Sequence, residues 1–215
     1  MSGDVLAAIC DVGRRLHARN LLAAADGNVS VLLEDGRIVM TPSGVAKGRL
    51  APGDLACLAL DGTVLAGRPS TERLMHLAVY GACPEARAVV HAHPPTAIAW
   101  SLAHPELAFL PGDALPEVIL AAGSIPLVPY ARPGTAAMGE HLLPFLPEFR
   151  LLILARHGAL AWGESLEEAY NGLERLEHVC QILKAACEWG GAKALPESEL
   201  SALRQARLQA GRKLL

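Results

Sequence analysis

Residues 89–95 read VVHAHPP and set two imidazoles at the end of an apolar run. The run from residue 86 to 93 consists mostly of β-branched and small residues, which favours a β-strand. Successive side chains of a strand point to opposite faces of a sheet, so His91 and His93 project from the same face, and the two prolines end the strand. The stretch therefore predicts a buried strand that carries two histidines at one point.

On either side of this strand, helical and strand patterns alternate. Asp-Gly pairs between apolar runs are typical of hairpins, and they predict two hairpins, at 29–41 and 55–67. Helical spacing of apolar residues predicts a first helix over 4–24 and a second one capped by Ser70 or Thr71 that ends near Cys83. Further helices are expected at 95–103, 114–122, 135–146, 165–189 and from about 197, with strands at 125–129, 150–156 and 159–163. Residues 1–215 are thus predicted to form one layered α/β domain whose sheet is mixed and largely antiparallel.

The composition narrows the class of protein. The chain has 215 residues, 52% of them hydrophobic and 19% charged, and a formal net charge of −3, so no basic field favours nucleic acid. No apolar run approaches the roughly 20 residues that cross a bilayer. The five cysteines are far apart and form no C-x-x-C pair, which favours a reducing cytoplasm. An acidic residue before the first apolar run and two arginines after it are unlike a secretory signal. Small molecules or other protein chains are the expected partners.

The histidine pair is a candidate for metal binding, because neutral imidazole is a good ligand for Zn²⁺ and similar ions. His91 and His93 alone also fit core or surface histidines that bond to backbone. A catalytic site normally needs a third protein ligand, and His157, just after an apolar strand and before a glycine, is the candidate. The remaining histidines fit solvated or helix-face positions better: His17, His104, His141 and His178. His76 shares a helix face with Glu72, and a supporting role beside the site and simple packing both remain open.

Three polar segments accompany these histidines. Glu72 follows Ser70 and Thr71, and it is either an acid that complements a helix dipole or a general base near the metal. The segments Gly27-Asn28 and 41–44 (TPSG) place a small polar side chain beside a glycine, as ordinary turns do and as anion-binding loops do. Together the segments and the three histidines indicate a metal site next to a phosphate pocket.

The order of these motifs resembles that of a known family. GNVS (27–30), TPSG (41–44), PSTE (69–72), HAHP (91–94), RHG (156–158) and AWGESLEEA (161–169) follow one another as in the class II aldolase/adducin family, and within it the L-fuculose-1-phosphate aldolase-like proteins. The resemblance runs from about residue 5 to 190. It implies a three-layer α/β/α fold around a mainly antiparallel sheet, and a homotetramer with active sites at subunit interfaces.

The resemblance also implies a role for each motif residue. His91, His93 and His157 would hold one divalent metal, zinc above all, with cobalt and manganese as alternatives. Glu72 would be the acid/base. The substrate phosphate would be bound by Asn28, Ser43, Gly44, Ser70 and Thr71. The implied reaction is cleavage of a small ketose 1-phosphate to dihydroxyacetone phosphate and an aldehyde, through an enediolate that the metal stabilises.

The residues that would contact the aldehyde part of the substrate depart from the family pattern. Fuculose-phosphate aldolases carry a tyrosine on the helix after the H-x-H strand, whereas residues 115–123 (LPEVILAAG) offer Glu117, and residues 200–215 contain no tyrosine either. Arg156 precedes the third histidine, where a cation can bind a carboxylate. Epimerisation, dehydration and decarboxylation of a sugar or keto acid phosphate therefore remain alternatives, and Glu117 and Arg156 speak for decarboxylation. A non-catalytic adducin-like interaction domain is the remaining alternative, and the convergent histidines speak against it.

Overall fold

A computed structural model describes residues 3–211 and 213–214. Within them, eight strands form one sheet in the order β4-β3-β2-β1-β5-β8-β7-β6. The strands are β1 (Asn28–Leu32), β2 (Arg37–Met40), β3 (Ala56–Ala59), β4 (Val64–Ala66), β5 (Ala88–Ala92), β6 (Leu127–Val128), β7 (Leu151–Leu154) and β8 (Gly158–Gly163). Neighbouring strands are antiparallel except β6 and β7, which are parallel. The sheet is therefore mixed and mainly antiparallel, as predicted, and both predicted hairpins are present.

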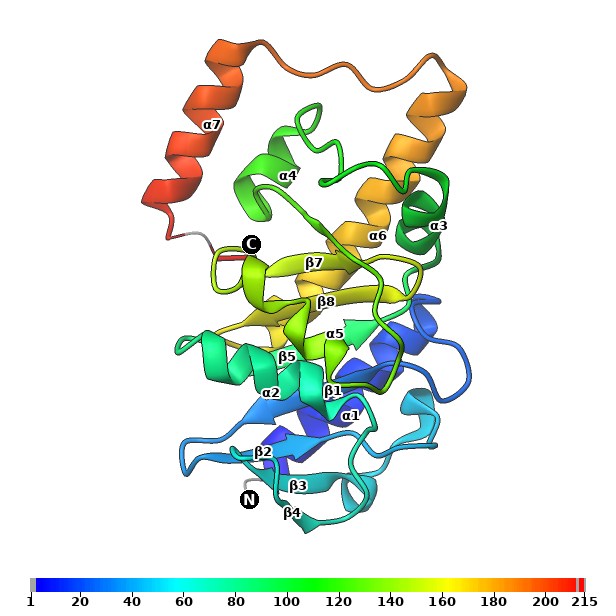
Figure 1. Ribbon diagram of the computed structural model, residues 1–215, viewed down its shortest axis with the longest axis vertical. Coiled ribbons are helices and arrows are strands. Elements are labelled where there is room, and N and C mark those ends of the chain that lie inside the picture. The colour runs from blue at the N-terminus through cyan, green and yellow to red at the C-terminus, as the bar shows by residue number, and fades with distance from the viewer. Residues whose placement is uncertain (1–2, 212, 215) are drawn as a thin grey trace.

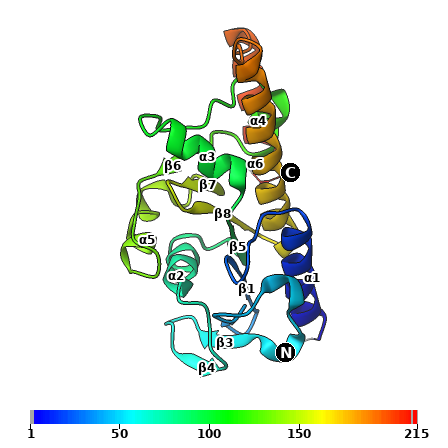
Figure 2. The same ribbon diagram turned by 90° about the vertical axis from the view of Figure 1, so that its right-hand side faces the viewer.

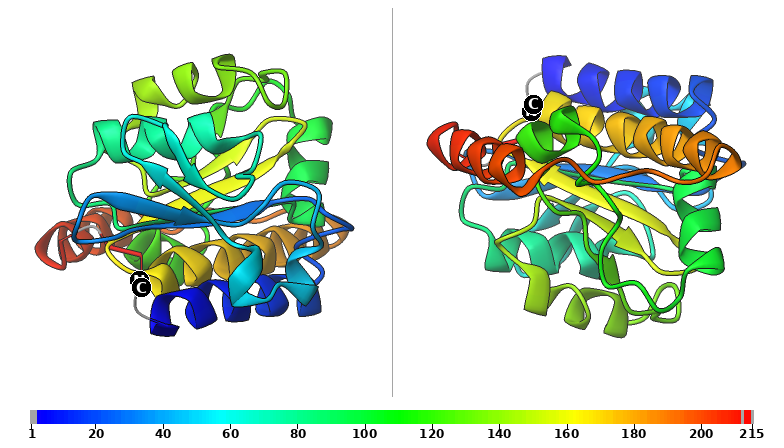
Figure 3. Two further views of the ribbon diagram at one scale, coloured as in Figure 1. Left: turned by 90° about the horizontal axis from the view of Figure 1, so that it is seen from below. Right: turned by 90° about the horizontal axis from the view of Figure 1, so that it is seen from above.

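Helices cover both faces of the sheet (Figures 1 and 2). One face carries α1 (Gly3–Ala18) and α6 (Leu166–Glu188), and the other carries α2 (Arg73–Ala82) and α5 (Ala137–Glu140). Figure 3 shows the sheet between these two layers of helices. The remaining helical segments are α3 (Pro95–Ala103), α4 (Pro116–Ala121), α7 (Glu197–Gln209), and the 3-10 turns η1 (Lys47–Arg49), η2 (Pro52–Asp54) and η3 (Leu143–Phe145). The α/β class with three layers is confirmed.

Two apolar clusters fill the spaces between the sheet and its helices. Strand β5 contributes to both, because its side chains alternate between the faces. Val90 and Ala92 pack in the cluster on the α1 and α6 face, whereas Val89 packs in the cluster that contains Met75 and Val79 of α2. His91, two residues after Val89, therefore lies on the α2 face. None of its side-chain surface is exposed.

The first predicted helix is too long. Helix α1 ends at Ala18, because Asn20 has a φ of +58° and turns the chain out of the helix. Leu21 and Leu22 keep the apolar spacing that extended the prediction to residue 24, yet they reach the core from the following loop. The backbone carbonyl of Leu21 accepts a hydrogen bond from the N–H of His93 (2.8 Å). The loop thus runs along the end of β5.

Two further helix predictions need correction. Helix α2 begins at Arg73, with Glu72 rather than Ser70 or Thr71 at the N-cap position. The predicted helix over 135–146 divides into α5 and η3, because Pro144 has no N–H for a continuing helix. In the part of the chain that the structure describes, every helix is too short or too polar to span a bilayer.

Candidate metal centre and acid/base site

Three histidines meet at the end of the central strands. His91 is on β5, His93 is the first residue after the end of β5, and His157 lies in the turn between β7 and β8. Strands β5 and β8 are neighbours, which brings the turn to the end of β5. The Nε2 atoms of His91 and His93 are 3.1 Å apart, and one ring nitrogen from each of the three residues lies within 4.8 Å of the others. The sequence prediction that His157 joins the pair in space agrees with this geometry.

The donor set fits a divalent metal. The Nδ1 of His91 lies 2.9 Å from the carbonyl oxygen of Ala159. A carbonyl only accepts, so Nδ1 carries the proton and Nε2 keeps its lone pair for a ligand bond. The Nε2 of His157 is buried and makes no hydrogen bond within the described residues. Burial lowers the pKa of His91 to about 3 and also lowers the pKa of His93. Neutral imidazoles with inward lone pairs are the state that binds Zn²⁺.

Two glycines allow this close approach. A Cβ at Gly158 would lie 2.5 Å from the carbonyl oxygen of Ala92 and 2.9 Å from ring atoms of both His91 and His93. Gly27 has a φ of +68°, and a Cβ there would lie 2.8 Å from the carbonyl oxygen of His91. Such contacts are too close for a side chain. The backbone on both sides of β5 therefore needs glycine to leave room for the histidines.

Glu72 points its carboxylate at this cluster. Its Oε1 lies 3.1 Å from Nε2 of His157, and its Oε2 lies 3.4 Å from Nε2 of His91. Oε2 also accepts a hydrogen bond from Nδ2 of Asn28 (2.8 Å). Although Glu72 occupies the N-cap position of α2, its side chain caps no helix N–H group. The helix-dipole interpretation of Glu72 therefore explains less of its geometry than a role beside the histidines.

The environment of Glu72 acts on its pKa in two directions. Burial raises the pKa, because it disfavours the charged form. The contact with Nε2 of His157, the electrostatic attraction of the His91 and His157 rings, and the hydrogen bond from the amide of Asn28 together lower it more, so the pKa lies below its usual range. Glu72 is therefore ionised at neutral pH.

The predicted phosphate-binding residues lie on three segments, of which two contact Glu72 through Asn28 and Ser70. Asn28 begins β1 and pairs with His91 across the sheet. The segments that hold Ser43 and Ser70 run together, because the N–H of Ser70 donates to the carbonyl of Thr41 (3.2 Å) and that of Ser43 to the carbonyl of Arg68 (3.0 Å). The buried Oγ of Ser70 accepts from the N–H of Glu72 (3.2 Å). The remaining two members, Gly44 with φ +75° and Thr71, are exposed.

The two possible substrate-contacting residues lie apart from each other. Arg156 is exposed beside His157 and holds a φ of +63°, with its N–H donating to Oγ of Ser101 (3.0 Å). Glu117 is exposed on the first turn of α4. Within the described residues no contact joins Glu117 to the histidines. The structure thus brings Arg156, and not Glu117, to the end of the sheet where the three histidines lie.

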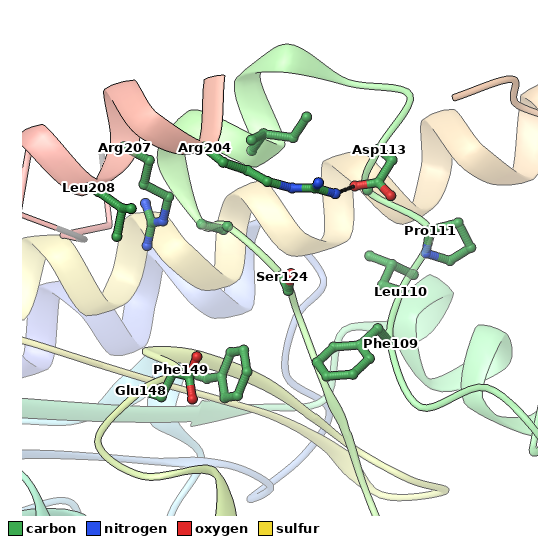
Figure 4. A pocket seen from close by; sticks show the side chains of 14 residues that line it. Phe109, Leu110, Pro111, Asp113, Ser124, Glu148, Phe149, Arg204, Arg207 and Leu208 are labelled. Atoms are coloured by element: carbon green, nitrogen blue, oxygen red, sulfur yellow. Dashed lines mark hydrogen bonds and ion pairs between the residues drawn. The ribbon is translucent and has the colours of Figure 1, made fainter. Parts of the chain in front are cut away.

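A separate cavity of about 480 Å³ opens between α4, α7 and the segment 109–113. Figure 4 shows Arg204 reaching across it to Asp113, with which it forms an ion pair at 3.3 Å. None of the candidate site residues lines this cavity. This cavity therefore lies apart from the candidate site.

Sequence reasoning did not single out Asp26 or Lys47. Oδ2 of Asp26 lies 3.5 Å from Nδ1 of His93, where a carboxylate orients the ring. Lys47 is buried, donates to the carbonyl of Ala25 (2.6 Å), and has its pKa lowered by burial, while Asp26 and Glu72 oppose that shift. Asp26 precedes the GNVS motif and Lys47 follows TPSG, so their positions beside these motifs are the sequence feature that could have identified them as neighbours of the site.

Similar proteins share this arrangement of elements. The chain is 38% identical to a 3-oxo-tetronate 4-phosphate decarboxylase of Escherichia coli over 77% of its own length and 79% of the relative's. The crystal structure of YgbL from Escherichia coli superposes with a TM-score of 0.84 at 32% identity, covering 94% of this chain and 98% of that one. An L-fuculose-1-phosphate aldolase from Thermus thermophilus superposes with a TM-score of 0.77 at 36% identity, covering 88% and 97%.

The family model described as Class II Aldolase and Adducin N-terminal domain matches residues 7–183. This stretch contains all three histidines, Glu72 and the three polar segments. The chain therefore belongs to the class II aldolase and adducin family.

Proposed function

We propose that the protein is a metal-dependent decarboxylase of a four-carbon keto acid phosphate of the 3-oxo-tetronate 4-phosphate type. The observation that carries the proposal is the carboxylate of Glu72 at 3.1 Å from His157 and 3.4 Å from His91, beside a cluster of three histidine rings. The similarity to a decarboxylase named for that substrate supports the choice of reaction. Aldol cleavage, the reaction first implied by the motif order, becomes the second candidate.

The substrate's own structure makes decarboxylation accessible. In a 3-oxo-tetronate 4-phosphate the keto group is β to the carboxylate, so breaking the C1–C2 bond releases CO₂ and leaves an electron pair conjugated with the C3 carbonyl. Protonation of C2 then gives dihydroxyacetone phosphate. A divalent ion held by His91, His93 and His157 would supply Lewis-acid stabilisation of the negative charge on oxygen. Zinc is the proposed ion, with cobalt and manganese as alternatives.

Glu72 is the proposed proton carrier. Because its pKa is lowered, it begins ionised and takes the proton of the C2 hydroxyl, returns a proton to C2 after CO₂ has left, and solvent restores the hydroxyl proton. Oε2 already accepts from Asn28. Oε1 faces His157, whose Nε2 has no proton to donate once its lone pair is used in a ligand bond. Oε1 is therefore the oxygen that carries the proton.

The charged ends of the substrate have partners of suitable chemistry. Asn28, Ser43, Gly44, Ser70 and Thr71 are proposed to bind the phosphate through amide, hydroxyl and backbone N–H groups. Arg156 is proposed to bind the carboxylate, because guanidinium pairs well with carboxylate and this side chain is exposed next to His157. Glu117 is not included in this proposal.

Aldol cleavage of a ketose 1-phosphate uses the same ligands and the same acid/base. Similarity to the Thermus thermophilus L-fuculose-1-phosphate aldolase favours it. The tyrosines expected in fuculose-phosphate aldolases are missing from residues 115–123 and 200–215, which leaves no such donor for the aldehyde oxygen on these segments. Aldol cleavage therefore stands second.

The test is an assay that separates the two products. Zinc-loaded protein is incubated with 3-oxo-tetronate 4-phosphate labelled at C1 and, separately, with ketose 1-phosphates, while labelled CO₂, aldehyde and dihydroxyacetone phosphate are measured. Decarboxylation predicts equal amounts of CO₂ and dihydroxyacetone phosphate from the keto acid only. Aldehyde without CO₂ would establish the aldolase instead, and no product from either substrate class would reject both.

The matched variant is Glu72→Gln, which keeps the size of the side chain and removes its basicity. We expect it to retain zinc and to lose product formation and the exchange of solvent protons into the hydroxymethyl carbon of dihydroxyacetone phosphate that derives from C2. Glu34, an exposed acid in the turn between β1 and β2 at the opposite end of β1 from Asn28, supplies the control Glu34→Gln with unchanged activity. Proton exchange that persists in Glu72→Gln would remove Glu72 from the role.

Assembly and compartment complete the proposal. The family resemblance predicts a homotetramer, and exposed large apolar side chains such as Trp189, 89% exposed, support burial against another copy. Light scattering on the purified protein measures the mass directly. The described cysteines are free thiols, which supports a reducing compartment such as the cytoplasm.

A further inference from the structure

A row of buried polar side chains lies behind Asn28, on the side away from the histidine cluster. Nε2 of His76 is 2.5 Å from Oδ1 of Asn28, Nδ1 of His76 is 2.7 Å from Oγ of Ser30, and that oxygen is 2.8 Å from the hydroxyl of Tyr80. At most 6% of the surface of any of these four residues is exposed. Asn28 and Ser30 are two apart on β1, and His76 and Tyr80 are four apart on α2, so strand and helix each present both residues to the other.

The direction of every hydrogen bond in this row follows from Glu72. Nδ2 of Asn28 donates to Oε2 of Glu72 (2.8 Å), which leaves Oδ1 of the same amide facing His76. Oδ1 only accepts, so Nε2 of His76 carries a proton. The neutral ring then accepts at Nδ1, so the hydroxyl of Ser30 donates to it and accepts from the hydroxyl of Tyr80.

The row holds His76 in one neutral form. Burial lowers the pKa of His76 to about 3, against a smaller opposing effect of Glu72, so the ring carries a single proton at neutral pH. Ser30 offers its proton to Nδ1, because the hydroxyl of Tyr80 occupies the acceptor side of the same oxygen. The proton of His76 therefore stays on Nε2, facing Asn28.

We propose that His76, held by Ser30 and Tyr80, is a positioning residue that locks the amide of Asn28. In the locked orientation one N–H of Nδ2 donates to Oε2 of Glu72, and the second N–H remains for the substrate phosphate. In the flipped orientation Oδ1 would face the carboxylate and the phosphate, two anions that only accept. The inference rests on the proposed acid/base role of Glu72, and it connects the proton carrier to the phosphate pocket through one amide.

Two isosteric variants separate positioning from packing. In His76→Gln the side-chain amide nitrogen reaches the place of Nε2 and still donates to Asn28. In His76→Asn the shorter amide reaches only the place of Nδ1, beside Ser30, and leaves Asn28 without its donor. Both variants are polar, and the one methylene by which they differ changes packing, which the melting temperature reports separately from kcat.

The expected result is a split between the variants. Zinc-loaded His76→Gln should keep kcat within about threefold of the parent, whereas His76→Asn should lose roughly 10–100-fold, the size of effect that outer-shell partners have at metal sites. Both should bind one zinc ion per chain and melt cooperatively. Equal loss or equal retention of kcat in two folded variants would overturn the proposal.

A second measurement needs no substrate and no variant. Nitrogen-15 NMR of histidine-labelled parent protein distinguishes the protonated from the unprotonated ring nitrogen, and His76 should show a proton on Nε2 and none on Nδ1. A proton on Nδ1, or two rapidly exchanging forms, would overturn the proposal even if the variants do not fold. Because this readout is independent of turnover, failure of the decarboxylase assay leaves it intact, and the two proposals can fail separately.

Discussion

Replacing Gly158 by alanine tests whether the histidine cluster depends on a missing Cβ. The new methyl group would lie 2.5 Å from the carbonyl oxygen of Ala92 and 2.9 Å from Cε1 of His91 and Cδ2 of His93. The φ of Gly158 is not positive, so the effect is steric and free of backbone strain. Hydrogen bonds between β5 and β8 hold the carbonyl in place, so the rings must move.

The size of the effect follows from these contacts. Extra volume in a packed site costs typically ~1–3 kcal/mol of unfolding free energy. Displaced rings should also weaken zinc binding by about 10–100-fold, the range seen when the surroundings of metal ligands are disturbed. A factor of ten in affinity is about 1.4 kcal/mol, so the loss in zinc binding corresponds to ~1.4–2.8 kcal/mol.

The assay measures stability and metal affinity separately. Urea titration of the protein in chelator reports the unfolding free energy, and competition with a chromophoric chelator reports the zinc dissociation constant. Gly81→Ala is the matched control, because a Cβ there meets no atom within 4 Å and alanine is the better helix former by about 1 kcal/mol. Wild-type zinc affinity and a stability loss under ~0.5 kcal/mol in Gly158→Ala would refute the steric reasoning, since they lie below the range expected for overpacking.

Three other outcomes are expected. The folded state keeps His76 neutral down to a pKa of about 3, whereas an unfolded histidine titrates near 6.5. The unfolding free energy of the metal-free protein should therefore fall by ~1.4 kcal/mol per pH unit as pH drops below about 6.5, with a slope smaller by that amount in His76→Gln; an equal slope would contradict the lowered pKa. Glu177 accepts from the N–H of Thr96 at 2.9 Å at the start of α3, so Glu177→Ala should lose ~1–2 kcal/mol in urea titrations, and an unchanged midpoint would rule out capping. Arg156→Asn tolerates positive φ and removes the charge, so KM for the keto acid phosphate should rise about 10-fold or more, while a KM unchanged from the parent would exclude carboxylate binding.

The sequence predicts the elements whose signals are local. Asp61-Gly62 marks a hairpin because a tight turn needs those residues, and the alternation around His91 places two histidines on one face. Helix ends were less predictable. Leu21 and Leu22 are buried, as a helical pattern requires, but the left-handed conformation of Asn20 ends the helix before them. Apolar spacing reports burial, and it does not say which backbone delivers the side chain.

In the candidate site too, local spacing predicts some residues and tertiary contacts determine others. His91 and His93 are two apart in one strand, and His157 marks another strand end, so spacing alone suggested the cluster. The contact between Asn28 and Glu72 spans 44 positions and needs the start of α2 to lie over the start of β1, which is next to β5 in the sheet. No local pattern encodes which strands are neighbours, so motif order in a resembling family was the only sequence signal for it.

The buried polar residues behind Asn28 are brought together by the tertiary structure, and no sequence motif predicts their contacts. Ser30 sits in an apolar strand and Tyr80 on an apolar helix face, so each by itself is an ordinary buried polar residue that needs a partner. Only the packing of α2 against β1 places both hydroxyls beside His76. Because the carboxylate of Glu72 accepts at one end, only one arrangement of protons satisfies every residue in the row. The hydroxyl of Tyr80, buried on α2, thereby helps to fix the orientation of the Asn28 amide beside the histidine cluster.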